Sequence, residues 1–190
     1  APARDGLGRD ELARLLDAAE QRIQSLHRSE RLQQALYEIA DLAGGSLELQ
    51  DMLRRIHAIV GELMYAGNLY IVLYDEHQQT MRFLYFVDKL DPYVNDPDAE
   101  LDFDQAEATL TVTLLRGGVA LRGPSCDLRE QCGIPYLESN GPDSADWMGV
   151  PMLVNERLVG ILALTSSELS AYTERQGQLA TAIASQAAVA

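Results

Sequence analysis

The chain has 190 residues, 47% hydrophobic and 23% charged, which is the composition of a globular protein and excludes wholesale disorder. A formal net charge of −14 makes nucleic acid and anionic membranes poor partners, and no apolar stretch is long enough for a membrane helix. Two cysteines, Cys126 and Cys132, are too few for a disulfide framework, so we expect the protein to reside in the reducing cytoplasm.

The first predicted element is a long helix over residues 9–43. Its first half has apolar residues at alternating spacings of four and three, the pattern of a two-stranded coiled coil. Because so narrow a stripe cannot hold a solitary helix together in water, we expect residues 1–31 to pair with a second copy. A helix lying on its own domain is the alternative. The predicted dimer seam consists of Leu12, Leu16, Ala19, Ile23 and Leu26.

Two further helices are predicted in residues 32–190. Residues 49–64 carry one apolar face, and residues 173–190 carry another. Thr173 and Gln176 form a capping box at the start of the last helix. That helix reaches Ala190 without a glycine or proline stop. Since the chain also lacks an initiator Met, we expect it to be a piece of a longer protein.

Two β-hairpins are predicted between these helices, one from strands 68–75 and 81–90, the other from strands 146–154 and 157–165. Asn155-Glu156 is the turn of the second hairpin. The crossover between the hairpins is predicted to contain, in order, an acidic loop at 91–105, a short helix at 108–116, a short strand at 119–122 and a second loop at 123–141. This second loop holds both cysteines, and a helical turn within it is left open.

This order predicts an α+β fold, an antiparallel sheet with a helical bundle on one face and loops and short helices over the other. Such loops leave room for a pocket of small-molecule size. Strand alternation assigns Leu69, Ile71 and Leu73 to the helices and the opposite parity to the pocket. Rings that simply fill the sandwich are the alternative. The candidate pocket residues are Tyr70, Val72, Tyr74, Phe83, Tyr85, Thr109, Thr113 and Trp147.

Four segments of the chain resemble the GAF domain, a sensory module of signalling proteins, and the similarity covers residues 32–190. The stretches YIVLYD, FVDxxD and DWMGVP are similar to the GAF subgroup found upstream of diguanylate cyclase and histidine kinase output domains in bacteria. One departure is Glu107-Ala108-Thr109, where the subgroup usually has a glycine. The segments that carry the resemblance are Leu53–Met64, Asn68–Asp91, Leu110–Leu121 and Ser144–Leu164.

The sequence predicts no cofactor. His27, His57 and His77 lie outside the predicted pocket face and its loops, which argues against haem or non-haem iron. Neither cysteine is followed by histidine, so the bilin attachment seen in similar domains is not expected. The Asn-Lys signature of cyclic-nucleotide GAF domains is also absent.

We expect no metal and no catalysis in this chain. The acids Asp96, Asp98, Glu100, Asp102 and Asp104 alternate along the acidic loop. An EF-hand requires glycine where Leu101 stands, so a solvated loop is the simpler interpretation. No catalytic constellation is found.

The resemblance therefore implies a cytoplasmic sensory domain of a cyclic-di-GMP or two-component signalling protein. It would act as a homodimer through its N- and C-terminal helices, which pass a small-molecule or conformational signal to a covalently linked output domain beyond Ala190. The ligand is unknown. One alternative is a ligand-free structural dimerisation module. Another is a thiol redox sensor that uses Cys126 and Cys132.

Overall fold

The computed structural model describes residues 4–91, 94–138 and 142–189. Contacts within the chain divide it into two compact units, Ala1–Gln34 and Ala35–Ala190. Helix α1 spans Arg4–Gly44 and crosses this division. None of the described helices is long and apolar enough to cross a membrane.

The first unit is helical, as the heptad pattern predicts, and its apolar stripe lies in solvent. Each seam side chain is exposed, with more than half of the surface of Leu12, Leu16, Ile23 and Leu26 accessible. Burying a leucine or isoleucine side chain of this kind contributes roughly 1.5–3 kcal/mol of free energy. The stripe is therefore a strong candidate for a surface that binds a partner helix. Pairing itself stays a prediction.

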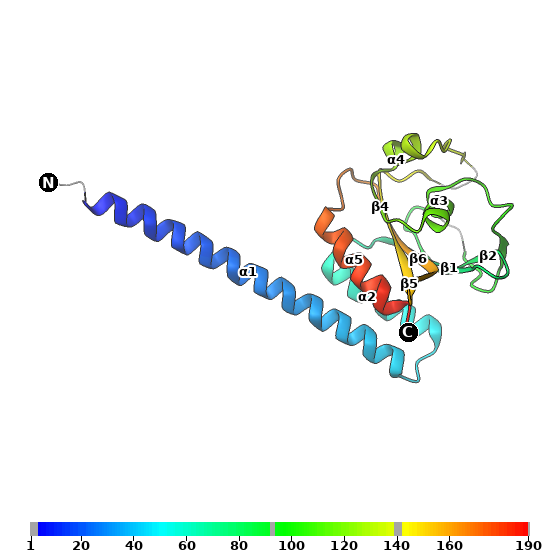
Figure 1. The fold of residues 1–190 in the computed structure, drawn as a ribbon, viewed down its shortest axis with the longest axis horizontal. Coiled ribbons are helices and arrows are strands. Elements are labelled where there is room, and N and C mark those ends of the chain that lie inside the picture. The colour runs from blue at the N-terminus through cyan, green and yellow to red at the C-terminus, as the bar shows by residue number, and fades with distance from the viewer. Residues whose placement is uncertain (1–3, 92–93, 139–141, 190) are drawn as a thin grey trace. The chain divides into compact units, whose positions relative to one another are not determined.

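The second unit is built on one six-stranded sheet in which the paired strands are antiparallel (Figure 1). The strand order β3-β2-β1-β6-β5-β4 places the two predicted hairpins side by side, joined by the pairing of β1 with β6. The strands are β1 (Asn68–Asp75), β2 (Thr80–Val87), β3 (Leu101–Asp102), β4 (Leu121–Pro124), β5 (Asp146–Val154) and β6 (Arg157–Ser166).

Helices cover both faces of this sheet, and each face has its own apolar core. Helices α2 (Leu49–Leu63) and α5 (Glu174–Ala187), with the end of α1, bury Leu69 and Ile71 of β1. Helices α3 (Leu110–Gly117) and α4 (Ser125–Cys132) lie over the other face, where Val72 and Trp147 are buried (Figure 1). The predicted α+β architecture is therefore confirmed.

Two local predictions are confirmed by backbone geometry. Asn155 and Glu156 both have positive φ, 49° and 64°, as a two-residue type I′ hairpin requires. The Thr173 side chain accepts from the Gln176 N–H while the Gln176 side chain accepts from the Thr173 N–H, which completes the capping box of α5. Both signals lie within a few residues of sequence and need no tertiary context.

A β-bulge corrects one predicted pocket residue. The β1–β2 register shifts between Ile71 and Val72, so Tyr85 pairs with Ile71 while Phe83 pairs with Val72. The extra residue on β2 reverses the alternation beyond it. Tyr85 therefore faces the helices, where its ring packs edge-on against His57 at a centroid separation of 5.6 Å.

The predicted loop at 123–141 contains a helix. Residues 125–132 form α4, which ends at Gly133 with φ of 67°. Cys126 and Cys132 thus lie on one helix, six residues apart, which places them about 9 Å apart along the axis and on different sides. The acidic loop likewise contains β3, a two-residue strand paired with β2.

We predict opposite effects from two glycine-to-alanine substitutions. A Cβ at Gly160 would collide with the Val72 carbonyl on the neighbouring strand, whereas one at Gly61, on α2, would meet open space. Gly160→Ala should destabilise the fold by about 2 kcal/mol because the strands must separate. Gly61→Ala should stabilise it by about 0.5–1 kcal/mol. Urea denaturation of the two variants measures both, and equal effects would contradict the close strand approach.

Candidate functional site

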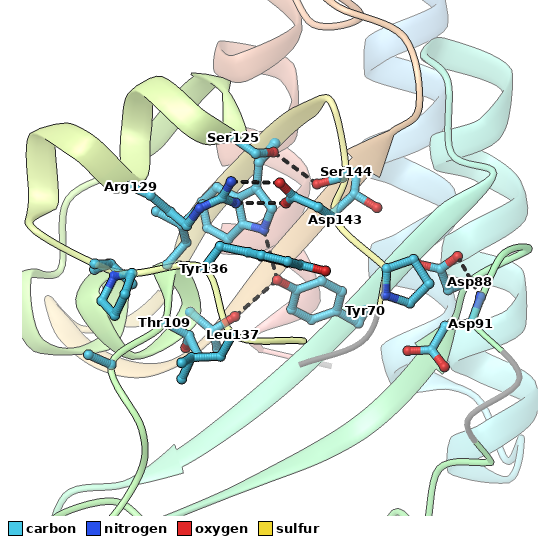
Figure 2. A pocket seen from close by; sticks show the side chains of 18 of the residues that line it. Tyr70, Asp88, Asp91, Thr109, Ser125, Arg129, Tyr136, Leu137, Asp143 and Ser144 are labelled. Atoms are coloured by element: carbon cyan, nitrogen blue, oxygen red, sulfur yellow. Dashed lines mark hydrogen bonds and ion pairs between the residues drawn. The ribbon is translucent and has the colours of Figure 1, made fainter. Parts of the chain in front are cut away.

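A cavity of about 480 Å³ lies between the sheet and the crossover segments. Its floor is formed by residues of β1, β2 and β5, and its cover by α3, α4 and the segments that follow α4. This volume lies in the range of natural small-molecule pockets. Figure 2 shows Tyr136 lying across the cavity over Tyr70.

Trp147 and Tyr70 form the floor of the cavity. The Trp147 Nε1–H donates to Tyr70 Oη at 2.9 Å, and that oxygen is 3.0 Å from Thr111 Oγ1 on α3. Burial raises the pKa of the Tyr70 hydroxyl, so the hydroxyl stays protonated. The indole occupies the space that a Cβ at Gly149 would need, which explains the glycine of the DWMGVP stretch.

The first turn of α3 faces the cavity. Thr109 is the N-cap, and its Oγ1 accepts from the Val112 N–H at 3.1 Å. The Thr113 N–H donates to the Thr109 carbonyl. Among the described residues the N–H groups of Leu110 and Thr111 have no hydrogen-bond acceptor, and both residues line the cavity. Helical N–H groups point toward the N-terminus, so they give this side a positive potential.

An ion pair and a hydroxyl pair fasten residues 143 and 144 of the cover to α4. Arg129 donates through both Nη atoms to the two carboxylate oxygens of Asp143, at 2.7 and 2.6 Å. This hydrogen bonding raises the pKa of Arg129 further. Ser125 Oγ and Ser144 Oγ are 2.9 Å apart. The Arg129 guanidinium also lies over the Tyr136 ring, 5.4 Å from its centroid.

The other side of the cavity is aromatic and acidic. The rings of Tyr70, Phe83 and Phe86 have centroids 5.7 to 6.1 Å apart. Asp88 follows Phe86 just beyond β2, and its Oδ1 accepts from the N–H groups of Leu90 and Asp91. Figure 2 places Asp88 and Asp91 across the cavity from Arg129 and Thr109.

The cavity wall contains half of the predicted pocket residues: Tyr70, Phe83, Thr109 and Trp147. Val72 is buried beneath the wall in the second core. Tyr74 packs against Phe103 at 4.8 Å instead. Thr113 is half-buried on α3, outside the lining, and Tyr85 is on the far face.

Sequence reasoning missed Phe86, Asp88, Arg129 and Asp143. Simple alternation assigns Phe86 to the helix-facing side of the sheet, and it does so wrongly because of the bulge. Arg129 falls in the segment predicted as a loop, where no periodic pattern assigns a side chain to the cavity. Its partner Asp143 is 14 residues away, and no sequence signal links the two.

The histidines and cysteines lie outside the described cavity wall. In its neutral form His57 donates through Nε2 to the Ala66 carbonyl and accepts the Tyr85 hydroxyl at Nδ1, at 2.6 and 2.9 Å. The Cys126 thiol donates to Asp127, which raises the pKa of the thiol. Among the described residues no cluster of His, Cys, Asp and Glu could hold a metal ion.

Comparison with known families identifies one match. The family profile described as GAF domain matches residues 46–190. No curated protein sequence matches the chain with significance.

Solved structures share the fold at low sequence identity. The GAF domain of a phosphoenolpyruvate-protein phosphotransferase from Coxiella burnetii has a TM-score of 0.65 at 15% identity, covering 84% of this chain and 91% of that one. Residues 122 to 287 of a methyl-accepting chemotaxis protein give 0.61 at 16% identity, covering 79% and 92%. Free methionine-R-sulfoxide reductase from Neisseria meningitidis, in complex with its substrate, gives 0.56 at 15%, covering 83% and 89%.

We predict that removing the Trp147 ring is the costliest change in the cavity floor. Trp147→Ala should destabilise the domain by about 3–5 kcal/mol, and Tyr70→Phe by about 1–3 kcal/mol, because the buried indole N–H loses its acceptor. Tyr37→Phe, at a residue 72% exposed, is the control. Denaturant unfolding followed by circular dichroism measures all three. An unchanged stability in Trp147→Ala would contradict a structural role for the indole.

Proposed function

This chain belongs to the GAF domain family, and from that premise we propose that it is the sensory domain of a signal-transduction protein. In this proposal a small effector binds in the cavity, and its binding shifts the flanking helices of a homodimer. The output domain follows Ala190 in the parent protein and is a diguanylate cyclase or a histidine kinase. The chain itself is not an enzyme, and it works in the cytoplasm.

The observation that carries this proposal is the cavity between the sheet and a cover held by side chains. Among the described residues, the Arg129–Asp143 ion pair and the Ser125–Ser144 hydroxyl pair join residues 143 and 144 to α4, and the Ser125 N–H donates to the carbonyl of the next residue, Ala145. Such a cover can open or tighten when a ligand replaces those contacts. A ligand shifts a conformational equilibrium only by its difference in affinity for the two states, and this cover supplies a contact that differs between them.

The chain after Ser144 leads to a hydrogen bond that holds the start of α5. Asp146, two residues after Ser144, is buried, and its Oδ2 accepts the N–H of Tyr172 at 3.1 Å. Tyr172 immediately precedes the N-cap of α5, and its carbonyl accepts from Arg122 of β4 at 2.9 Å. Because α5 is the last described element, a change at its start is the route by which we propose the signal leaves the domain.

The fold alone leaves chemistry open, since structural neighbours include both signalling proteins and a free methionine-R-sulfoxide reductase. Sulfoxide reduction by a thiol at the cavity is not supported here, because neither cysteine is in the described wall. The redox-sensor alternative is also weakened. Cys126 has a raised thiol pKa, and the two thiols are too far apart along α4 for a disulfide without unwinding.

A ligand-free dimerisation module remains the rival function, and the exposed seam of α1 favours it as much as it favours a sensor. The two functions differ in whether the cavity is used.

We predict that protein purified under native conditions retains a small molecule. Native mass spectrometry should show a mass excess that disappears on denaturation. The matched variant Ala108→Trp, an exposed residue in the cavity wall, should lose the excess because the indole narrows the cavity. An identical mass in native and denatured samples, with no effect from the metabolites tested, would favour the structural module.

We also predict a parallel homodimer held in part by the seam. Leu16→Glu with Ile23→Glu should weaken the dimer at least tenfold without unfolding residues 35–190, because four like charges would meet at the seam. Gln21→Glu with Ser25→Glu adds the same charge on the opposite side of α1 and should leave the dimer unchanged. Light scattering at tens of micromolar reports the mass, and a monomer for the unmodified chain would refute the prediction.

A further inference from the structure

The charges in the cavity wall are separated, with positive potential on one side and negative charge on the other. Arg129 and the first turn of α3 lie on one side, while Asp88 and Asp91 lie across the cavity (Figure 2). Arg129 is already paired with Asp143 on the first side, so a ligand carboxylate that binds there must replace Asp143. This pattern therefore contains information about ligand chemistry that the volume alone does not.

The positive side is built for a carboxylate. Arg129 presents both Nη atoms in the fork that carboxylates bind bidentately, and its side chain is only 16% exposed. Asp143, 40% exposed, now occupies this fork. The N–H groups of Leu110 and Thr111, which have no partner among the described residues, add donors in the cavity wall directly after the N-cap Thr109. Asp143 therefore stands where a ligand carboxylate would bind.

The negative side is built for an ammonium group. One oxygen of Asp88 accepts two backbone N–H groups, which fixes the carboxylate in place and leaves Oδ2 for a ligand. The rings of Tyr70, Phe83 and Phe86 form the adjoining wall. Aromatic faces attract cations, so an ammonium there gains from both the carboxylate and the rings.

A dicarboxylate and a diamine each match only one side of this wall. A dicarboxylate at Arg129 would place its second charge toward Asp88 and Asp91. A diamine would leave the α3 N-terminus and the Arg129–Asp143 pair unused. A ligand with one carboxylate and one ammonium group matches both sides, and the cavity of about 480 Å³ accommodates an amino acid with a large side chain.

We propose that the effector is a small zwitterion of the amino-acid class. Its carboxylate displaces Asp143 from Arg129, and its ammonium group binds between Asp88 and the aromatic wall. This inference rests on the proposed sensory function and names the ligand class of the same cavity. It also assigns Asp143 the role of an internal competitor for the carboxylate site.

The first test is thermal unfolding of the full chain with each proteinogenic L-amino acid at about 10 mM. At least one should raise the melting temperature by about 3 °C or more. The N-acetyl and carboxamide derivatives of that amino acid, which lack one charge each, should bind about tenfold more weakly or worse in calorimetry. No stabilisation by any amino acid, or a derivative that binds as well as its parent, would overturn the proposal.

The second test uses two substitutions that change the cavity charge equally. Asp143→Asn removes the competitor and should tighten binding of that amino acid several-fold, whereas Asp88→Asn removes the ammonium partner and should weaken it about tenfold. Arg129→Gln should abolish binding, and Asp17→Asn, on the exposed part of α1, is the control. Unliganded melting temperatures and Trp147 fluorescence check that each variant folds. Shifts in the same direction for both cavity aspartates would refute the two-ended site.

The outcomes separate the ligand class from the function. If succinate or putrescine stabilises the protein and no amino acid does, the zwitterion proposal fails while the sensory function stands. If these probes have no effect and native mass spectrometry shows no retained molecule, the sensory function fails with it.

Discussion

The hydrogen bond from Trp147 to Tyr70 determines how the cavity side of the domain is arranged. Strand β6 lies between β5 and β1 in the sheet, so this one contact spans three strands. It is possible only because Gly149 leaves the indole room to lie flat on the sheet. The same phenol oxygen contacts Thr111, so it also positions the first turn of α3. The floor and one wall of the cavity thus depend on a single aromatic pair.

The sequence predicts those parts of the fold whose signals are local. The Asn155-Glu156 turn and the capping box at Thr173 each depend on a few adjacent residues, and both are found where expected. The two faces of β1 follow from simple alternation, because the extra residue of the bulge lies on β2 and β1 itself alternates regularly. Helix α4 was predicted only as an optional helical turn in a loop, because eight residues with few apolar positions give a weak periodic signal.

The cavity residues show where alternation stops being informative. One extra residue at the bulge turns Tyr85 toward the helices and Phe86 toward the cavity. The residue types of β2 give no signal that predicts this bulge. Arg129 and Asp143 are 14 residues apart in the sequence and meet only in the folded domain. Long-range ion pairs of this kind require the tertiary fold before they can be recognised, whereas Trp147 and Tyr70 are recognisable as large residues on a predicted face.

Asp143 and Asp146 are separated by three peptide units, and each is fastened to a different element. Asp143 is bound to α4 through Arg129, and Asp146 is bound to the residue before the N-cap of α5. Extended chain of this length spans roughly 10 Å. So short a tether, anchored at both ends, has little slack to absorb a displacement. One short segment therefore joins the residue that pairs with Arg129 to the residue that holds the start of α5, and Ala145 within it is also bonded to Ser125 of α4 and Ser166 of β6.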